Sequence, residues 1–246
     1  MSRDLERLDQ LLVDRGLAES VTRAQALILA GRVVVAGHRR EKPGERVSRQ
    51  ADVHLKGHKE WASRGAYKLL GALEALPALA ERIRGAHCLD IGASTGGFTD
   101  VLLHQGAASV VALDVGYGQL DWRLRSDERV VVLDRTNIRH LAPDRLDPKP
   151  SVVTCDASFI SVRKFLHVVA REMAEGGVFI CLVKPQFELP REAVGEGGVV
   201  RDPELRSRAL HEVRSAAEDL GFSYLGSFDS PITGPKGNRE LLLVLE

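Results

Sequence analysis

The stretch at residues 87–104 constrains the fold most, because an apolar strand, a glycine-rich loop and a helix follow one another there without interruption. Residues 88–91 predict a short buried strand, and the apolar spacing of residues 99–104 predicts a helix. Three glycines lie between them: Gly92, Gly96 and Gly97. A loop of this kind at the end of a parallel strand is typical of a nucleotide-type site, since a side chain would block close approach of the ligand to the backbone.

Two acids accompany the loop, and the glycines follow the spacing Gly-x-x-x-Gly-Gly rather than the dinucleotide pattern Gly-x-Gly-x-x-Gly. Asp90 precedes the loop, and Asp114 ends a second predicted strand, where a carboxylate can accept both hydroxyls of a ribose. Asp90, the loop and Asp114 together resemble the S-adenosylmethionine (SAM) site of Rossmann-like methyltransferases. The alternative is a plain βα turn beside an incidental acid, and the position of Asp114 favours the ligand site over it.

This resemblance implies SAM as the cofactor, and it adds Asp134, at the end of the third predicted strand, as an acid that meets the adenine amino group. Asp156 ends the fourth predicted strand and should face the same crevice, because the carboxyl ends of parallel strands share one edge of the sheet. The candidate cofactor-binding residues are Asp90, Gly92, Ser94, Gly96, Gly97, Phe98, Asp114, Val115, Asp134 and Asp156.

Strands and helices alternate along 64–246, which predicts an α/β fold with a Rossmann-like, doubly wound and mostly parallel sheet. Seven strands are expected, at residues 88–91, 110–113, 130–133, 151–155, 178–183, 223–228 and 240–245. The main helices are expected at residues 64–76, 162–173 and 204–220. The short connection before the final strand predicts that this strand is antiparallel. The glycine-rich residues 189–200 predict a mobile loop or lid.

Residues 1–57 predict a small α+β domain of two short helices followed by short strands. A first helix is indicated by leucines at helical spacing, namely Leu5, Leu8, Leu11 and Leu12. Gly16 ends that pattern, and Ser20 predicts the N-cap of the second helix. Strands are expected at residues 32–36 and 53–55, with a highly charged loop between them.

Three stretches of this domain resemble the alpha-L RNA-binding fold of pseudouridine synthases and of one ribosomal small-subunit protein: Arg7-Leu8-Asp9 with Leu11-Leu12, Ser20-x-x-x-Ala24, and Gly31-Arg32-Val33-x-Val35-x-Gly37. The resemblance implies an RNA-binding domain at 1–57, a polar linker at 58–63 and a methyltransferase domain at 64–246. Arginines can contact RNA phosphates, whereas the alternative is an ordinary solvated charged surface. The candidate RNA-binding residues are Arg7, Arg23, Arg32, Arg39, Arg40 and Arg64.

Charge is distributed unevenly, although the 246-residue chain has no formal net charge. Residues 1–84 contain 16 Lys and Arg against 11 Asp and Glu, which suggests an anionic partner at the N-terminal end. Cys88, Cys155 and Cys181 lie in apolar runs without a Cys-x-x-Cys pair, so we expect no metal or redox site, and buried thiols suit a reducing compartment. Residues 1–15 are too charged for a signal peptide, and no apolar run approaches the ~20 residues that span a bilayer, so we expect a cytoplasmic protein without a membrane pore.

Four polar residues are expected to meet in the crevice at the strand ends: Lys68, Asp156, Lys184 and Glu240. Asp156 and Lys184 end the fourth and fifth predicted strands, Lys68 lies on the helix before the first strand, and Glu240 begins the last strand. This set resembles the Lys-Asp-Lys-Glu tetrad of the FtsJ/RrmJ-type ribose 2′-O-methyltransferases, which makes the four residues the candidate catalytic residues. The alternative is a pair of ordinary salt bridges.

The chain as a whole resembles the TlyA (haemolysin A) family of ribosomal RNA cytidine 2′-O-methyltransferases. The matching stretches span nearly the whole sequence and include Ser63-Arg64-Gly65-x-x-Lys68-Leu69, Asp90-Ile91-Gly92-x-Ser94-x-Gly96-Gly97-Phe98-Thr99, Asp134-x-Thr136-Asn137, Asp156-x-Ser158-Phe159-Ile160-Ser161, Lys184-Pro185-Gln186-Phe187-Glu188 and Gly237-Asn238-x-Glu240. The resemblance implies methyl transfer from SAM to the ribose 2′-hydroxyl of a cytidine in ribosomal RNA, with ribosomal subunits as partners and no metal. The sequence leaves open which nucleotide and which subunit are modified, and the oligomeric state.

A ribose hydroxyl is a weak nucleophile that must lose its proton as it attacks, so Lys184 is the candidate base or orienting group. Lys184 has another available role, stabilisation of the developing alkoxide, with positioning supplying most of the rate. Two further functions stay open. One is a SAM-binding ribosome assembly or RNA-binding factor without catalysis, and the other, with less support, is a haemolysin.

Overall fold

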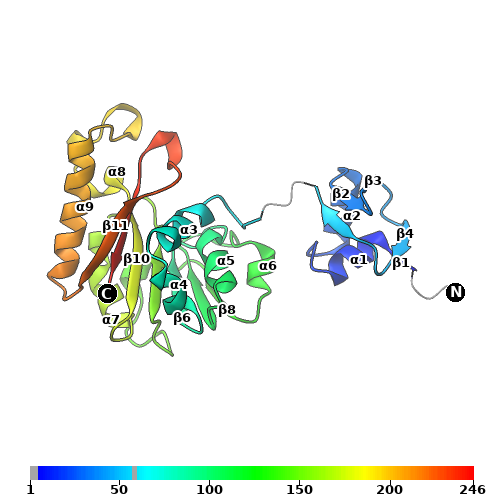
Figure 1. Ribbon diagram of the computed structural model, residues 1–246, viewed down its shortest axis with the longest axis horizontal. Helices are drawn as coiled ribbons and strands as arrows, with labels where there is room; N and C mark the ends of the chain where they lie inside the picture. Colours follow the sequence, from blue (N-terminus) through cyan, green and yellow to red (C-terminus); the bar gives the residue numbers. More distant parts are fainter. Residues whose placement is uncertain (1–4, 57–59) are drawn as a thin grey trace. The chain divides into compact units, whose positions relative to one another are not determined.

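The computed structural model describes residues 5–56 and 60–246, which divide into two compact units, Met1–Glu60 and Trp61–Glu246 (Figure 1). The linker expected at 58–63 begins with residues that lie outside the described ranges. Each unit has a hydrophobic core of its own and is therefore described by itself. Within the described ranges, no helix has both the length and the apolar character needed to cross a membrane.

The first unit is a small α+β domain. Its elements are β1 (Leu5–Arg7), α1 (Leu8–Asp14), α2 (Val21–Leu29), β2 (Val33–Val35), β3 (His38–Arg40), β4 (Arg46–Ser48) and β5 (Val53–Leu55). Strand β2 lies between β3 and β5 in an antiparallel sheet, and β1 pairs with β4. Apolar side chains from both helices and from β2 form the core, including Leu8, Leu12, Ile28 and Val33. As predicted, Ser20 caps α2: its Oγ accepts a hydrogen bond from the Arg23 backbone N at 3.2 Å.

Two predictions for this unit are wrong. Leu5 belongs to a strand rather than to the first helix, and its side chain is 51% exposed, so it does not share the buried face of Leu8, Leu11 and Leu12. The charged loop expected between β2 and β5 contains β3 and β4. These are three-residue strands with mostly polar and exposed side chains, so their sequence carries no alternating apolar pattern.

The second unit is built around a sheet of seven strands among its described residues, in the order β11-β12-β10-β9-β6-β7-β8. The strands are β6 (His87–Ile91), β7 (Ser109–Leu113), β8 (Val130–Leu133), β9 (Val152–Cys155), β10 (Val178–Val183), β11 (Tyr224–Asp229) and β12 (Leu241–Leu245). Strands β6 to β10 pair in parallel, and β12 is antiparallel to both β10 and β11. The predicted mostly parallel sheet with an antiparallel last strand is confirmed. The strand order reverses at β6, and ligands bind at such switch points in open α/β sheets.

Helices cover both faces of this sheet (Figure 1). They are α3 (Ala66–Ala75), α4 (Ala78–Ile83), α5 (Gly97–His104), α6 (Trp122–Arg125), α7 (Leu166–Glu172), α8 (Pro185–Glu188) and α9 (Pro203–Glu218). Strand β10 is buried along its whole length: Ile180 and Leu182 pack with α3, α4 and α5, whereas Phe179 and Cys181 pack with α7 and α9. A strand buried on both faces reads as a continuous apolar run, which is why the sequence located β10 correctly.

Several segments differ from the sequence expectation. The helix expected at 162–173 is a 3-10 turn (Val162–Lys164) followed by α7, because Phe165 leaves the helical region with φ −136°. The helices α4, α6 and α8 were not predicted, since each has only four to six residues and none shows a full amphipathic period. Residues 189–200 form two 3-10 turns, Arg191–Ala193 and Glu196–Gly198, and a short antiparallel bridge joins Gly195 to Val199.

Candidate active site

The glycine-rich loop after β6 is shaped by close contacts of its backbone. Gly92 has φ +79°, and a Cβ there would lie 2.9 Å from the Cα of Ala157, so the loop touches the segment that follows β9. Gly97 begins α5, and a Cβ there would lie 2.8 Å from the backbone N of Ala66. The loop therefore lies directly against the start of α3, which carries Lys68, and against the end of β9, which precedes Asp156.

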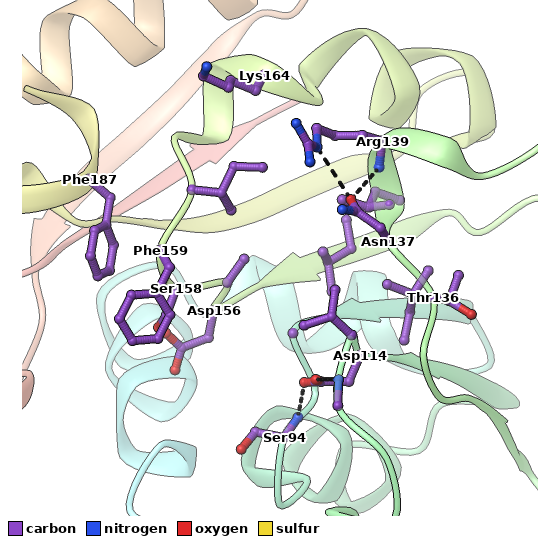
Figure 2. Close-up of a pocket in the computed structure, with 18 of the residues that line it drawn as sticks. Ser94, Asp114, Thr136, Asn137, Arg139, Asp156, Ser158, Phe159, Lys164 and Phe187 are labelled. Carbon is purple, nitrogen blue, oxygen red and sulfur yellow. Dashed lines mark hydrogen bonds between the residues drawn. The ribbon is translucent and has the colours of Figure 1, made fainter.

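A cavity of about 910 Å³ opens at the carboxyl ends of β6, β7 and β9 (Figure 2). Its lining includes Gly92, Ser94, Asp114, Asn137 and Asp156. The Asp114 carboxylate is fixed by backbone donors: Oδ2 accepts from the Ser94 N at 2.8 Å and Oδ1 from the Gly116 N at 2.7 Å. Each ionised carboxylate oxygen has a second lone pair, so Asp114 can still accept two ligand hydroxyls.

A second cavity of about 310 Å³ adjoins the first. The two share Gly92, Ser94, Asp156 and Ser158 in their linings. Lys68, Lys184, Phe98 and Gly234 line only the smaller one. Figure 2 shows Asp156 and Ser158 on one side of the larger cavity and the hydrogen-bonded Asp114 and Ser94 on the other. The site therefore has two compartments that meet at Asp156 and Ser158.

The four residues of the predicted tetrad come together, and three of them, Lys68, Asp156 and Lys184, line the smaller cavity. Lys68 Nζ lies 3.0 Å from Asp156 Oδ2 and 2.8 Å from Glu240 Oε2. Lys184 Nζ lies 2.7 Å from Asp156 Oδ1, so the Asp156 carboxylate bridges the two lysines. Glu240, Lys184 and Lys68 are buried, with exposed fractions of 1%, 5% and 8%. Two positive and two negative groups balance one another, which is the condition under which a protein tolerates buried charge.

The electrostatics of Lys68 follow from this arrangement. Burial lowers the pKa of Lys68, but the ion pairs with Asp156 and Glu240 outweigh burial and raise the pKa above its ordinary value. Lys68 is therefore a cation at neutral pH. It is suited to hold Asp156 and Glu240 in place rather than to accept a proton.

Three of the predicted cofactor-binding residues lie outside the lining of both cavities in the described ranges: Asp90, Gly96 and Asp134. Asp90 is fully buried and accepts hydrogen bonds from Thr99 Oγ1 at 2.7 Å and Thr154 Oγ1 at 3.1 Å. Burial raises its pKa to about 6, although these hydrogen bonds act in the opposite direction. Asp134 is held by Arg125 at 2.6 Å. The remaining predicted cofactor-binding residues line one or both cavities.

Some cavity residues were not singled out as site residues from the sequence. They are Ser158, Phe159, Phe187, Gln119, Thr136 and Asn137. Phe159 is 91% exposed with φ +66°, and its ring centroid lies 5.3 Å from that of Phe187. Ser158 and Phe159 lie two and three residues after the strand-end residue Asp156, and they belong to a stretch that matches the family, so both signals could have indicated them.

The candidate RNA-binding arginines of the first unit are mostly at its surface. Arg7, Arg23, Arg32 and Arg39 are exposed and Arg40 is half-buried. Several are paired with acids, as Arg7 with Asp9, Arg39 with Glu41 and Arg40 with Glu45. Arg64 belongs to the second unit, where it is exposed and lines the smaller cavity. Across the described ranges, no group of His, Cys, Asp and Glu side chains is arranged to hold a metal ion.

Comparisons with known proteins identify the same two units. The model of the FtsJ-like methyltransferase family matches residues 61–246, and the model of the S4 domain matches residues 6–53. The 16S/23S rRNA (cytidine-2′-O)-methyltransferase TlyA of Mycobacterium tuberculosis is 48% identical over 97% of this chain and 89% of its own length. Hemolysin A of Brachyspira hyodysenteriae is 38% identical over 96% of this chain and 98% of its own length.

A solved structure from Streptococcus thermophilus is 42% identical, with a TM-score of 0.73, and covers 99% of this chain and 88% of that chain. The similarity thus extends through both units and agrees with the fold described above. The chain belongs to the TlyA family, with an S4 domain and an FtsJ-like methyltransferase domain.

Proposed function

We propose that this protein transfers a methyl group from SAM to the ribose 2′-hydroxyl of a cytidine in ribosomal RNA. The observation that carries the proposal is the ion-paired set of Lys68, Asp156, Lys184 and Glu240 beside a cavity that adjoins a larger, ligand-sized one. Cytidine and ribosomal RNA as the substrate are supported by the name of the relative from M. tuberculosis.

The larger cavity fits a nucleoside cofactor. Its volume of about 910 Å³ lies within the range of small-molecule sites. Asp114 presents two oriented carboxylate oxygens that would hold the ribose hydroxyls, and the bare backbone at Gly92 permits close approach. SAM, when bound there, supplies an electrophilic methyl group. Asp90 would contribute indirectly, by holding Thr99 of α5 and Thr154 of β9 beneath the loop.

The smaller cavity would receive the target ribose. The 2′-hydroxyl must be held still and lose its proton as its oxygen forms a bond to the methyl carbon. Lys184 Nζ is the group placed to meet this hydroxyl, either as the proton acceptor or as the cation that stabilises the developing oxyanion. Asp156 orients Lys184, and Lys68 with Glu240 orients Asp156.

The S4 domain would hold structured RNA. Its exposed arginines at positions 7, 23, 32 and 39 can approach phosphates, and Arg64 can meet the RNA at the smaller cavity. A ribosomal substrate would make the protein cytoplasmic, with ribosomal subunits as its partners.

The proposed function is tested by methyl transfer from labelled SAM to ribosomal subunits, free ribosomal RNA and intact ribosomes, followed by mass mapping of the product. We expect a 2′-O-methylated cytidine from the wild type, and a rate at least about 100-fold lower from Lys184→Ala, because tetrad residues act as one unit. Lys149→Ala is the control, since Lys149 is exposed and its Nζ donates only to the Arg171 carbonyl among the described residues.

The two alternative outcomes are informative. Tight SAM binding without methylation of any ribosomal substrate would overturn catalysis and favour the assembly-factor function. Full activity of Lys184→Ala would leave methylation standing but reject the role assigned to the tetrad.

A further inference from the structure

Protein acceptors surround the ammonium of Lys184. A protonated lysine has three N–H donors. In the part of the chain that the structure describes, Lys184 Nζ donates hydrogen bonds to the Asp156 backbone O at 3.1 Å and to Ser158 Oγ at 2.7 Å, and it forms an ion pair with Asp156 Oδ1 at 2.7 Å. Lys184 is 5% exposed, so water has little access to it. A substrate hydroxyl can therefore engage Lys184 only by displacing one of these acceptors.

The three acceptors differ in how easily they can leave. The Asp156 carboxylate is charged and also binds Lys68, so moving it would disrupt the tetrad. The Asp156 backbone is fixed at the end of β9, where its N donates to the Ile91 carbonyl at 3.0 Å. Ser158 is exposed, neutral and beyond the strand end, and its hydroxyl can move by rotation about a single bond. Ser158 is the acceptor that can be exchanged.

The position of Ser158 supports the same conclusion. It lines both cavities, so it lies at the point where a bound cofactor and an incoming ribose would meet. Figure 2 shows it next to Asp156 at the edge of the larger cavity. A hydroxyl 2.7 Å from Lys184 Nζ at this point has the chemistry and the location expected of the substrate hydroxyl itself.

We propose that Ser158 holds the place of the substrate hydroxyl on Lys184 in the free enzyme, and that the ribose 2′-hydroxyl displaces it on binding. This inference rests on the proposed function. The exchange replaces one neutral hydroxyl acceptor of the Lys184 ammonium with another, so no covalent bond changes and no proton is lost. Ser158 is a positioning residue: it keeps the Lys184 ammonium directed at the junction of the cavities until the substrate arrives.

The proposal differs from a proton relay, in which Ser158 would carry the proton from the ribose to Lys184 during reaction. A placeholder has left Lys184 before the chemical step, so its removal spares kcat. A relay acts in the transition state, so its removal lowers kcat.

The test is steady-state methylation of the ribosomal substrate by the wild type, Ser158→Ala and Ser158→Thr. For Ser158→Ala we expect kcat within about twofold of wild type and a KM for RNA about threefold lower, because the competing hydrogen bond is gone. Ser158→Thr keeps the hydroxyl and should restore the wild-type kcat and KM.

Ser207→Ala on α9 is the matched control, since Ser207 is exposed and lies in neither cavity lining. Thermal melting and SAM binding verify that every variant is folded. A kcat lowered tenfold or more, or an unchanged or raised KM, would each overturn the exchange. An inactive wild type would instead overturn the proposed function, and the exchange with it.

Discussion

Buried charge is paired differently around Asp9 of the S4 domain and in the tetrad of the methyltransferase domain. The carboxylate of Asp9 is buried, and its partner Arg7 has a side chain that is 55% exposed. In the tetrad the cations are buried as well, since the side chains of Lys68 and Lys184 are 10% and 6% exposed. A buried carboxylate with an exposed cation keeps much of the ion pair hydrated, whereas two buried lysines have lost most of their hydration.

We interpret this difference as one between a charge that supports the fold, at Asp9, and charges that take part in chemistry, in the tetrad. Asp9 accepts from Arg7, Gln25 and its neighbour Gln10, which joins β1, α1 and α2 within one small domain. Burial of two lysines against two carboxylates carries a desolvation cost that a hydrophobic replacement would avoid. Because three of the four residues line a cavity, we propose that the methyltransferase domain keeps this arrangement for reactivity.

The largest effect is expected from Asp156→Asn. Both lysines lose the charge that joins them, so we expect methylation to fall at least about 100-fold and the free energy of unfolding to fall by about 3 kcal/mol. Rate assays and urea denaturation measure the two effects. Asp127→Asn, which breaks the more exposed Asp127–Arg129 pair, should change neither by much. Equal losses of activity and stability in the two variants would show that the buried ion pairs matter no more than the exposed one.

Asp114→Asn should act on the cofactor rather than on the chemistry. An amide has one acceptor atom in place of two, so we expect the Kd for SAM to rise about 10- to 100-fold. Isothermal titration calorimetry measures this, with Asp144→Asn as the control because Asp144 lines neither cavity. Unchanged SAM binding would mean that the ribose hydroxyls are held elsewhere.

Asp90 is expected to make the free energy of unfolding depend on pH. Its pKa is raised from 3.8 to about 6 in the folded state, so the folded protein binds this proton more tightly than the unfolded chain. Asp90 therefore opposes folding fully above about pH 6, and this penalty is relieved as the pH falls from about 6 towards 3.8. At about 1.4 kcal/mol per pKa unit the penalty is about 3 kcal/mol.

Denaturation of the wild type and Asp90→Asn between pH 5 and 8 tests this account. The pKa of Asp9, Asp127 and Asp134 is lowered by arginine partners, so these acids lose stabilisation on acidification in both proteins. If Asp90 is ionised at neutral pH, the difference in free energy of unfolding between the wild type and Asp90→Asn should become smaller as the pH falls. A constant difference would show that Asp90 does not titrate in this range.

The smallest effect is expected in the S4 domain. Arg39 is exposed and pairs only with the exposed Glu41 among the described ion pairs, so Arg39→Ala should leave folding and SAM binding unchanged. If Arg39 contacts a phosphate, RNA binding should weaken about threefold, and the slope of log K against log salt should lose about 0.7–0.9. A salt titration measures this, and an unchanged slope would remove Arg39 from the RNA interface.

The sequence predicted the parts of the molecule that follow from local pattern. Buried strands such as β7 and β10 read as continuous apolar runs, and their ends placed Asp114 and Lys184 correctly at the edge of the sheet. We expected the four tetrad residues to meet for two reasons. Several of them lie at predicted strand ends, which share one edge of the sheet, and the set resembles the tetrad of a known family. Local spacing alone cannot bring together residues as distant as Lys68 and Glu240.

What the sequence missed depends on the direction of side chains in the folded chain. Asp134 follows β8 as Asp114 follows β7, yet Asp134 points towards Arg125. Asp90 lies inside β6, one residue before its end, and points into a pair of threonines. The contact between Ser158 and Lys184 joins two loops from neighbouring strands. Such pairings are decided by packing and backbone turns, which apolar periodicity does not encode.

The carboxylate of Asp156 pairs with both Lys68 and Lys184, so substitutions at these residues are not independent of one another. Any change at Lys184 alters the field that Asp156 presents to Lys68, and Lys68 passes the change on to Glu240. The losses caused by single substitutions in the tetrad should therefore overlap rather than add, and a double substitution should be little worse than the more severe single one. The four side chains should therefore respond to mutation as one connected network of ion pairs.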